Sequence, residues 1–173
     1  MQVVLTISAI AGSTMAYADE NGENLIYFGA GPAKSANSLN NSGDNPLSIG
    51  FLRLSNTSDA VWGLDFSGEG TMRDSTGSNY NAIKQATSFN FLIGRNIIRN
   101  ESSRFDAAFI LGVREKTSEC PKSYLGYQCY ADTDPNKSYG LNYGLALTWT
   151  YKNVMLGVRA TGESTQALLG LRF

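Results

Sequence analysis

The chain has 173 residues, enough for one domain. Its 14 Lys and Arg nearly balance 15 Asp and Glu, so nothing in the composition favours a nucleic-acid partner. His is absent altogether, which disfavours the hydrolytic and acyl-transfer sites that use His as a general base. No stretch approaches the ~20 consecutive apolar residues of a membrane helix.

The N-terminus has the pattern of an export signal. Residues 3–11 are apolar, and Ala16-Tyr17-Ala18 fits a cleavage site between small residues. The positively charged start of such a signal is missing, because no Lys or Arg precedes Lys34. A buried first strand or helix is the alternative. We expect residues 1–18 to be a signal peptide and residues 19–173 to form the mature domain.

The mature chain is expected to begin with two strands, at residues 25–31 and 47–55, whose faces the sequence leaves open. In the next three segments large apolar residues alternate with small or polar ones, which is the period of a strand with two different faces. The apolar positions are Trp62, Leu64 and Phe66, then Phe89, Phe91 and Ile93, then Phe105, Ala107, Phe109, Leu111 and Val113.

The clearest strand covers residues 139–151, where thirteen residues alternate without a break. Large apolar or aromatic side chains fill one face, and Gly, Asn, Ala and Thr fill the other. A tight turn at Lys152-Asn153 leads to a strand at 154–160, and a last strand, 166–173, ends on Phe173. Eight strands are therefore predicted.

The predicted connections alternate in length. Those at 56–59, 98–103 and 152–153 are short, and those at 33–45, 71–85 and 115–137 are long and polar, with 161–164 as a short exception. Short turns at one end and long loops at the other are typical of an outer-membrane barrel, and an even strand count puts both termini on the periplasmic side.

Alternation alone also fits a soluble sandwich or a lipocalin-like barrel, whose apolar face points inward. The opposite face decides, because a soluble surface strand would carry Lys, Glu and Arg where this chain has small neutral residues. The interior of an eight-stranded barrel is only wide enough for side chains, so small residues suit it. We therefore predict an all-β, eight-stranded, antiparallel up-and-down transmembrane barrel with its apolar residues facing lipid.

Most charges within the strands share the face that is predicted to point inward. Since an unpaired buried charge is costly, we expect an interior ion-pair network. Its members would be Asp65, Glu69, Asp106, Arg114, Arg159 and Arg172. Arg95 lies on the apolar face near a strand end, where it could reach the lipid headgroups.

The only two cysteines, Cys120 and Cys129, lie in the third long loop and are expected to form a disulfide in an oxidising compartment. Tyr124, Tyr127 and Tyr130 cluster around this disulfide. They could form a binding surface, or the loop could simply be solvated and closed against proteases.

These alternating strands, the loop asymmetry and the terminal strand 166–173 resemble the family of small outer-membrane barrels that includes the OmpA transmembrane domain and the OmpX/Ail group. The resemblance implies residence in the bacterial outer membrane, in contact with lipid and lipopolysaccharide. It also implies that Phe173 is part of the signal read by the barrel-assembly machinery.

The leading hypothesis is a non-enzymatic, monomeric surface barrel whose loops serve adhesion or other surface contacts, or envelope integrity. It needs no cofactor, metal or catalytic residue. The alternatives are an outer-membrane enzyme acting on lipid A or phospholipid, a narrow pore, and a soluble lipocalin-type carrier. The enzyme alternative lacks the His that such barrels use.

Overall fold

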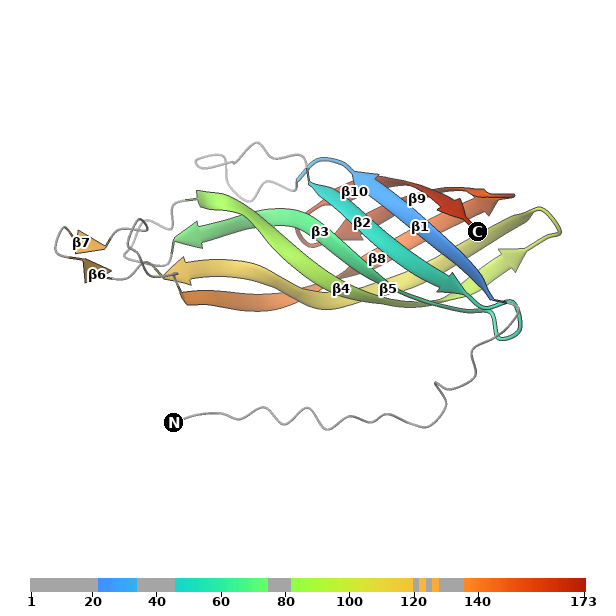
Figure 1. The fold of residues 1–173 in the computed structure, drawn as a ribbon, viewed down its shortest axis with the longest axis horizontal. Coiled ribbons are helices and arrows are strands. Elements are labelled where there is room, and N and C mark those ends of the chain that lie inside the picture. The colour runs from blue at the N-terminus through green and yellow to red at the C-terminus, as the bar shows by residue number, and fades with distance from the viewer. Residues whose placement is uncertain (1–21, 34–45, 75–81, 120–121, 124–125, 128–135) are drawn as a thin grey trace.

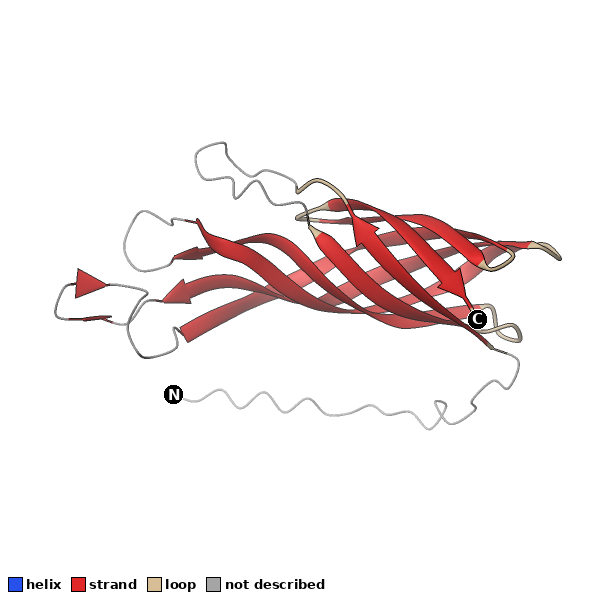
Figure 2. Ribbon diagram, turned by 45° about the horizontal axis from the view of Figure 1, so that its top comes forward, coloured by secondary structure: helices blue, strands red, loops and turns tan. Residues whose placement is uncertain are grey.

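A computed structural model describes the residues 22–33, 46–74, 82–119, 122–123, 126–127 and 136–173. All regular elements among them are strands (Figure 2), and none of the described segments is a helix long and apolar enough to cross a membrane. Eight strands close into one antiparallel barrel in the order β1-β10-β9-β8-β5-β4-β3-β2, which confirms the predicted fold (Figure 1). They are β1 (Glu23–Ala30), β2 (Leu47–Leu54), β3 (Ala60–Asp74), β4 (Ala82–Arg99), β5 (Ser103–Glu119), β8 (Asn136–Tyr151), β9 (Val154–Thr161) and β10 (Thr165–Arg172).

Two further strands, β6 (Lys122–Ser123) and β7 (Gly126–Tyr127), have two residues each and follow β5 in the chain. They pair with each other in a separate sheet and do not belong to the barrel.

The two ends of the barrel differ. Both ends of the barrel sheet and the turns after β2, β4 and β8 lie at one end, which we call the turn end. The opposite end, the loop end, carries the longer connections and the turn between β9 and β10. In Figure 1 the turn end is on the right and the loop end on the left.

Half of the barrel is built from long strands. β3, β4, β5 and β8 have 15, 18, 17 and 16 residues, whereas β1, β2, β9 and β10 have 8 each. The long strands extend past the others at the loop end and form a projecting sheet (Figure 1). There the tips of β3 and β5 pair in parallel, at Arg73 with Thr117 and at Asp74 with Ser118.

The predicted long connections at 71–85 and 115–137 are therefore wrong in extent. β3 continues to Asp74 past a register shift next to Gly70, whose φ is +74°, a backbone conformation that favours glycine. The pattern used for prediction detects strands with one apolar face. This alternation ends where the strands extend beyond the apolar part of the outer surface, although their backbone groups still pair with neighbouring strands.

The exterior carries an unbroken row of apolar side chains. Backbone pairs lead once around the barrel from Leu141 to Trp149, a shift of eight residues along β8 (149 − 141 = 8). This shift in a barrel of eight strands corresponds to a strand tilt of about 36°. The row is Leu141, Val113, Phe89, Phe66, Ile49, Phe28, Leu169, Leu156 and Trp149, all of them exposed.

Candidate functional site

The interior of the loop-side half of the barrel holds an ion cluster, the ionic layer, formed by Asp65, Glu69 and Arg159. Arg159 donates to Asp65 from Nε (3.2 Å) and Nη2 (2.9 Å), and to Glu69 from Nη1 and Nη2. All three side chains are buried. Arg159 lies on β9 and both carboxylates lie on β3, four strands away in either direction, so this ion pairing joins opposite walls of the barrel.

Neutral polar side chains surround Asp65. The Tyr27 hydroxyl donates to Asp65 Oδ2 at 2.8 Å, and Asn90 Nδ2 donates to Oδ1 at 2.7 Å. Together with Arg159, these donors satisfy a carboxylate that burial would otherwise penalise strongly.

Glu69 is held in the same manner from the loop end. Its Oε2 accepts hydrogen bonds from the hydroxyls of Ser164 (2.8 Å) and Thr161 (3.0 Å), and its Oε1 accepts from Asn142 and Ser88. The lumen is therefore filled by a hydrogen-bonded layer with contributions from strands on every side.

Glycine makes room for the largest side chain of this region. In the register of the sheet, Tyr27 on β1 lies between Gly50 on β2 and Gly170 on β10. A Cβ at Gly50 would lie 2.2 Å from the Tyr27 ring carbon Cζ, so the ring occupies the space of the absent side chain. The ring can thereby cross β2 and reach Asp65 on β3.

The turn-side half of the interior is different, because it holds a cluster of buried apolar side chains, the apolar layer. The small and neutral residues that the sequence shows on the inward face of residues 139–151 are thus joined in this half by larger apolar ones. A lumen closed to water is packed like any protein core, so apolar residues fill it where no charge is present. The main members are Leu25, Leu52, Leu54, Val61, Leu92, Ile110 and Met155.

The other three charges predicted for the interior lie apart from the ionic layer, each with its own partner. Asp106 pairs with Arg104 at 2.7 Å, with both side chains 2% exposed. Arg114 pairs with Glu163 at 2.5 Å at the loop end, and Arg172 pairs with Glu23 at 3.0 Å at the turn end.

The sequence reasoning missed three partners of these charges. Arg104 shares the alternation of Asp106 and could have been found from it. Glu163 lies in a predicted turn, and Glu23 precedes the predicted start of the first strand, so no alternation pointed to either residue. Tyr27 was missed because the faces of the first strand were left open.

Some predicted site residues lie outside the described part of the chain. These are residues 1–18, both cysteines (Cys120 and Cys129) and two of the loop tyrosines, Tyr124 and Tyr130. Tyr127 belongs to β7. Phe173 is 70% exposed, and its backbone exchanges hydrogen bonds with Asn24, which extends the pairing of β10 with β1.

The carboxylates of Asp65, Glu69 and Asp106 each face an Arg at ion-pair distance. In the described ranges, no group of three His, Cys, Asp or Glu side chains is arranged to hold a metal ion.

No protein-family model and no curated protein matches the sequence. Similar solved structures include three of the Yersinia pestis outer membrane protein Ail. Its structure in a phospholipid bilayer nanodisc has 14% identity and a TM-score of 0.47, with 88% of this chain and 99% of that chain covered. The crystal structure of Ail in complex with the heparin analogue sucrose octasulfate has 14% sequence identity to this chain and a TM-score of 0.42. A further crystal structure of Ail has 13% sequence identity and a TM-score of 0.43. Each covers 88% of this chain and 97% of that chain.

The geometry of this chain itself indicates where it resides. In its closed part the sheet has no open edge, its exterior is apolar and its interior is polar or packed, which is what the hydrocarbon region of a bilayer requires. Barrels of this kind belong to the bacterial outer membrane.

Proposed function

We propose that this chain is a non-enzymatic integral barrel of the bacterial outer membrane whose projecting sheet and loops provide a surface for contacts outside the cell. The observation that carries the proposal is the continuous outward row from Leu141 to Trp149, which surrounds an interior filled by side chains. Such a body anchors what it carries and leaves the lumen little room for a substrate.

The interior supports a scaffold rather than an enzyme or a pore. Arg159 spans the lumen between opposite walls, and its two carboxylate partners are fixed by Tyr27, Asn90 and Ser164. A general acid or base needs access to a substrate proton, and these groups are buried. Planar-bilayer recording should accordingly show no stable ion conductance.

The projecting sheet is the part best placed to meet other molecules. It continues the long strands past the barrel body and ends in the loop-end connections. Its outer face on β8 carries Tyr139 (64% exposed) and Tyr143 (63%), and its flanks carry the exposed Lys116 and Lys137, the latter paired with Glu115 at 2.8 Å. Exposed Tyr residues are enriched at protein-binding surfaces.

The bounds of β5 and β8 allow the loop between them to be replaced without shortening either strand. Residues 120–135 would be replaced by a short Gly-Ser turn, which retains β5 and β8 in full. Cells that display this variant should lose adhesion to host surfaces or survival in serum, while the barrel remains in the membrane. A substitution at Gly162, in the short loop-end turn, is the control. If neither readout changes, the surface-contact proposal is wrong and a purely structural role remains.

The remaining assignments belong to the same proposal. Residues 1–18 would act as the signal peptide that directs export. The assembly machinery would recognise the chain through Phe173, and the barrel would be monomeric in the membrane. Its third loop would be closed by a disulfide between Cys120 and Cys129, with Tyr124, Tyr127 and Tyr130 as its contact residues. Migration on gels with and without reductant, using Cys120→Ser as a control, tests the disulfide.

A further inference from the structure

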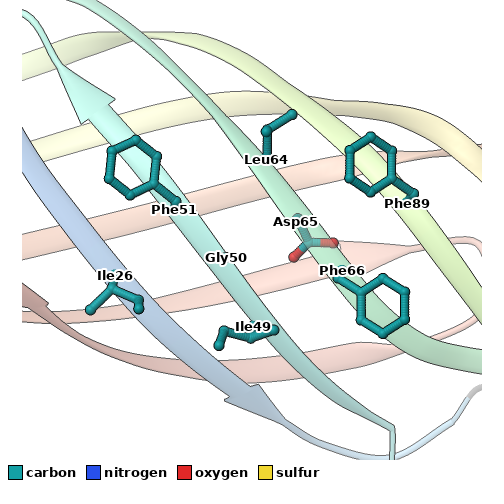
Figure 3. A pocket seen from close by; sticks show the side chains of 8 residues that line it. All are labelled: Ile26, Ile49, Gly50, Phe51, Leu64, Asp65, Phe66 and Phe89. Atoms are coloured by element: carbon teal, nitrogen blue, oxygen red, sulfur yellow. The ribbon is translucent and has the colours of Figure 1, made fainter.

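A shallow apolar groove lies on the outer wall of the barrel, over β1 to β4. Its volume is about 240 Å³, and its lining is almost entirely apolar. Figure 3 shows the apolar side chains around the position of Gly50, together with Asp65, whose carboxylate accepts a hydrogen bond from Arg159 in the interior. The apolar side chains are Ile26, Ile49, Phe51, Leu64, Phe66 and Phe89.

A cationic rim follows the groove toward the turn end. On the outward face, the pair Phe51–Leu64 is followed by the pair Arg53–Trp62, roughly 7 Å nearer the turns. Trp62 pairs in turn with Ile93, so Arg95, two residues further along β4, is its diagonal neighbour at roughly 7–8 Å. Arg53 and Arg95 therefore flank one exposed indole.

The two guanidinium groups are held differently. Arg53 is half-buried and donates from Nη1 to Asn24 Oδ1 at 2.9 Å, which holds it against the barrel wall. Arg95 is exposed, and among the described residues none pairs with it. Asp59, at the same end, is engaged by Arg99 at 3.1 Å. Arg95 thus presents its positive charge outward, at the depth where an indole ring meets the edge of the hydrocarbon region.

We propose that this groove and rim form a binding site for one anionic glycerophospholipid of the turn-side leaflet. An acyl chain would lie among the phenyl rings of Phe51, Phe66 and Phe89, and the headgroup phosphate would meet Arg95 and Arg53 next to Trp62. The inference deepens the proposed function, because it rests on the barrel being in a membrane. Charge complementarity selects the occupant, since the groove accepts any acyl chain but the cationic rim favours an anionic headgroup.

The two tryptophans of the chain offer a matched test. Trp149→Phe leaves Trp62 as the reporter at the site, and Trp62→Phe leaves Trp149 as the reporter on β8. Brominated phosphatidylglycerol should quench Trp62 more strongly than brominated phosphatidylcholine. Arg95→Gln should lower this preference about fivefold, the effect of roughly one basic residue near a membrane surface, and should leave the Trp149 reporter unchanged.

Three results would overturn the proposal. They are equal quenching of Trp62 by the two lipids, an unchanged preference in Arg95→Gln, and an equal loss at Trp62 caused by Lys152→Gln. Lys152 lies over the Tyr151 ring in the turn between β8 and β9, outside the proposed site. Displacement of phosphatidylglycerol from Trp62 by lipid A at lower concentration would assign the site to the other leaflet and also contradict it.

The groove itself is tested by Ile49→Phe, which fills it without changing charge. Native mass spectrometry of the barrel, purified with phosphatidylglycerol present, should show fewer retained lipid molecules for this variant than for the unaltered chain, and unchanged retention would contradict the tail assignment. Heat-modifiable gel migration and detergent dependence report the membrane barrel separately, so failure of the lipid site and failure of the proposed function are distinguishable.

Discussion

The ionic layer and the apolar layer occupy the same closed lumen, but they stabilise the barrel in different ways. In the ionic layer, Asp65 and Glu69 depend on one cation from the opposite wall, Arg159. In the apolar layer, side chains such as Leu52 and Ile110 are buried against one another and need no specific partner. Ion pairing demands one geometry, whereas apolar packing tolerates small adjustments.

The difference assigns separate tasks to the two halves. A buried ion pair contributes little net stability compared with apolar residues of similar volume, but it is costly to break. Since Arg159 joins β9 to β3 across the lumen, we infer that the ionic layer selects the correct closure of the barrel. The apolar layer supplies packing next to the turns, where both ends of the barrel sheet meet.

The largest expected effect comes from removing the shared cation. Arg159→Ala leaves two buried carboxylates without a countercharge and should lower the free energy of unfolding by about 3–5 kcal/mol. Urea unfolding in lipid vesicles measures it. The triple variant Asp65→Asn, Glu69→Gln, Arg159→Met removes all three charges together and should recover most of the loss. A loss below about 1 kcal/mol for Arg159→Ala would show that the layer is not a coupled unit.

The apolar layer should respond to loss of volume instead of loss of charge. Leu52 is 1% exposed, and Leu52→Ala should cost about 2–4 kcal/mol because a cavity remains in a packed lumen. Leu156→Ala is the matched control on the outer surface, 49% exposed, where lipid can fill the space. Equal losses for the two variants would mean that the turn-side interior is not tightly packed.

A smaller effect is expected where the two layers meet. Tyr27→Phe removes only the hydroxyl that donates to Asp65 Oδ2 at 2.8 Å, while the ring keeps its place over Gly50. The loss should be about 1–2 kcal/mol, since Asp65 keeps its bonds from Asn90 and Arg159. The loss should be much reduced in the Asp65→Asn background, and a double-mutant cycle in the same urea assay checks this coupling. Additive losses would contradict it.

The smallest effect should be found at the ion pair that lies at the loop end of the barrel. The pair of Arg114 and Glu163 has side chains 17% and 28% exposed, so water and salt screen it more than the ionic layer. Arg114→Gln should lower the free energy of unfolding by about 0–1 kcal/mol, less at high salt. A loss as large as that of Arg159→Ala, and independent of salt, would mean that the pair of Arg114 and Glu163 belongs to the ionic layer.

The sequence predicted those features of the fold that depend on which way a strand residue points. The unbroken alternation of residues 139–151 identified β8 and its outward face, and Trp62, Leu64 and Phe66 did the same for β3. Where the alternation stops, prediction stopped as well, so the projecting ends of β3, β4, β5 and β8 were assigned to loops. Strand pairing outside an apolar belt leaves little trace in the side-chain pattern.

By itself, the sequence determined a closed eight-stranded barrel with an apolar exterior, because side-chain period and turn spacing are local properties. It also assigned Asp65, Glu69 and Arg159 to the inward face. Only the tertiary structure decided that these three meet across the lumen, while Asp106 turns to Arg104. The reason is physical: partners inside a barrel are chosen by strand register and shear, which bring together residues 90 or more positions apart in the chain.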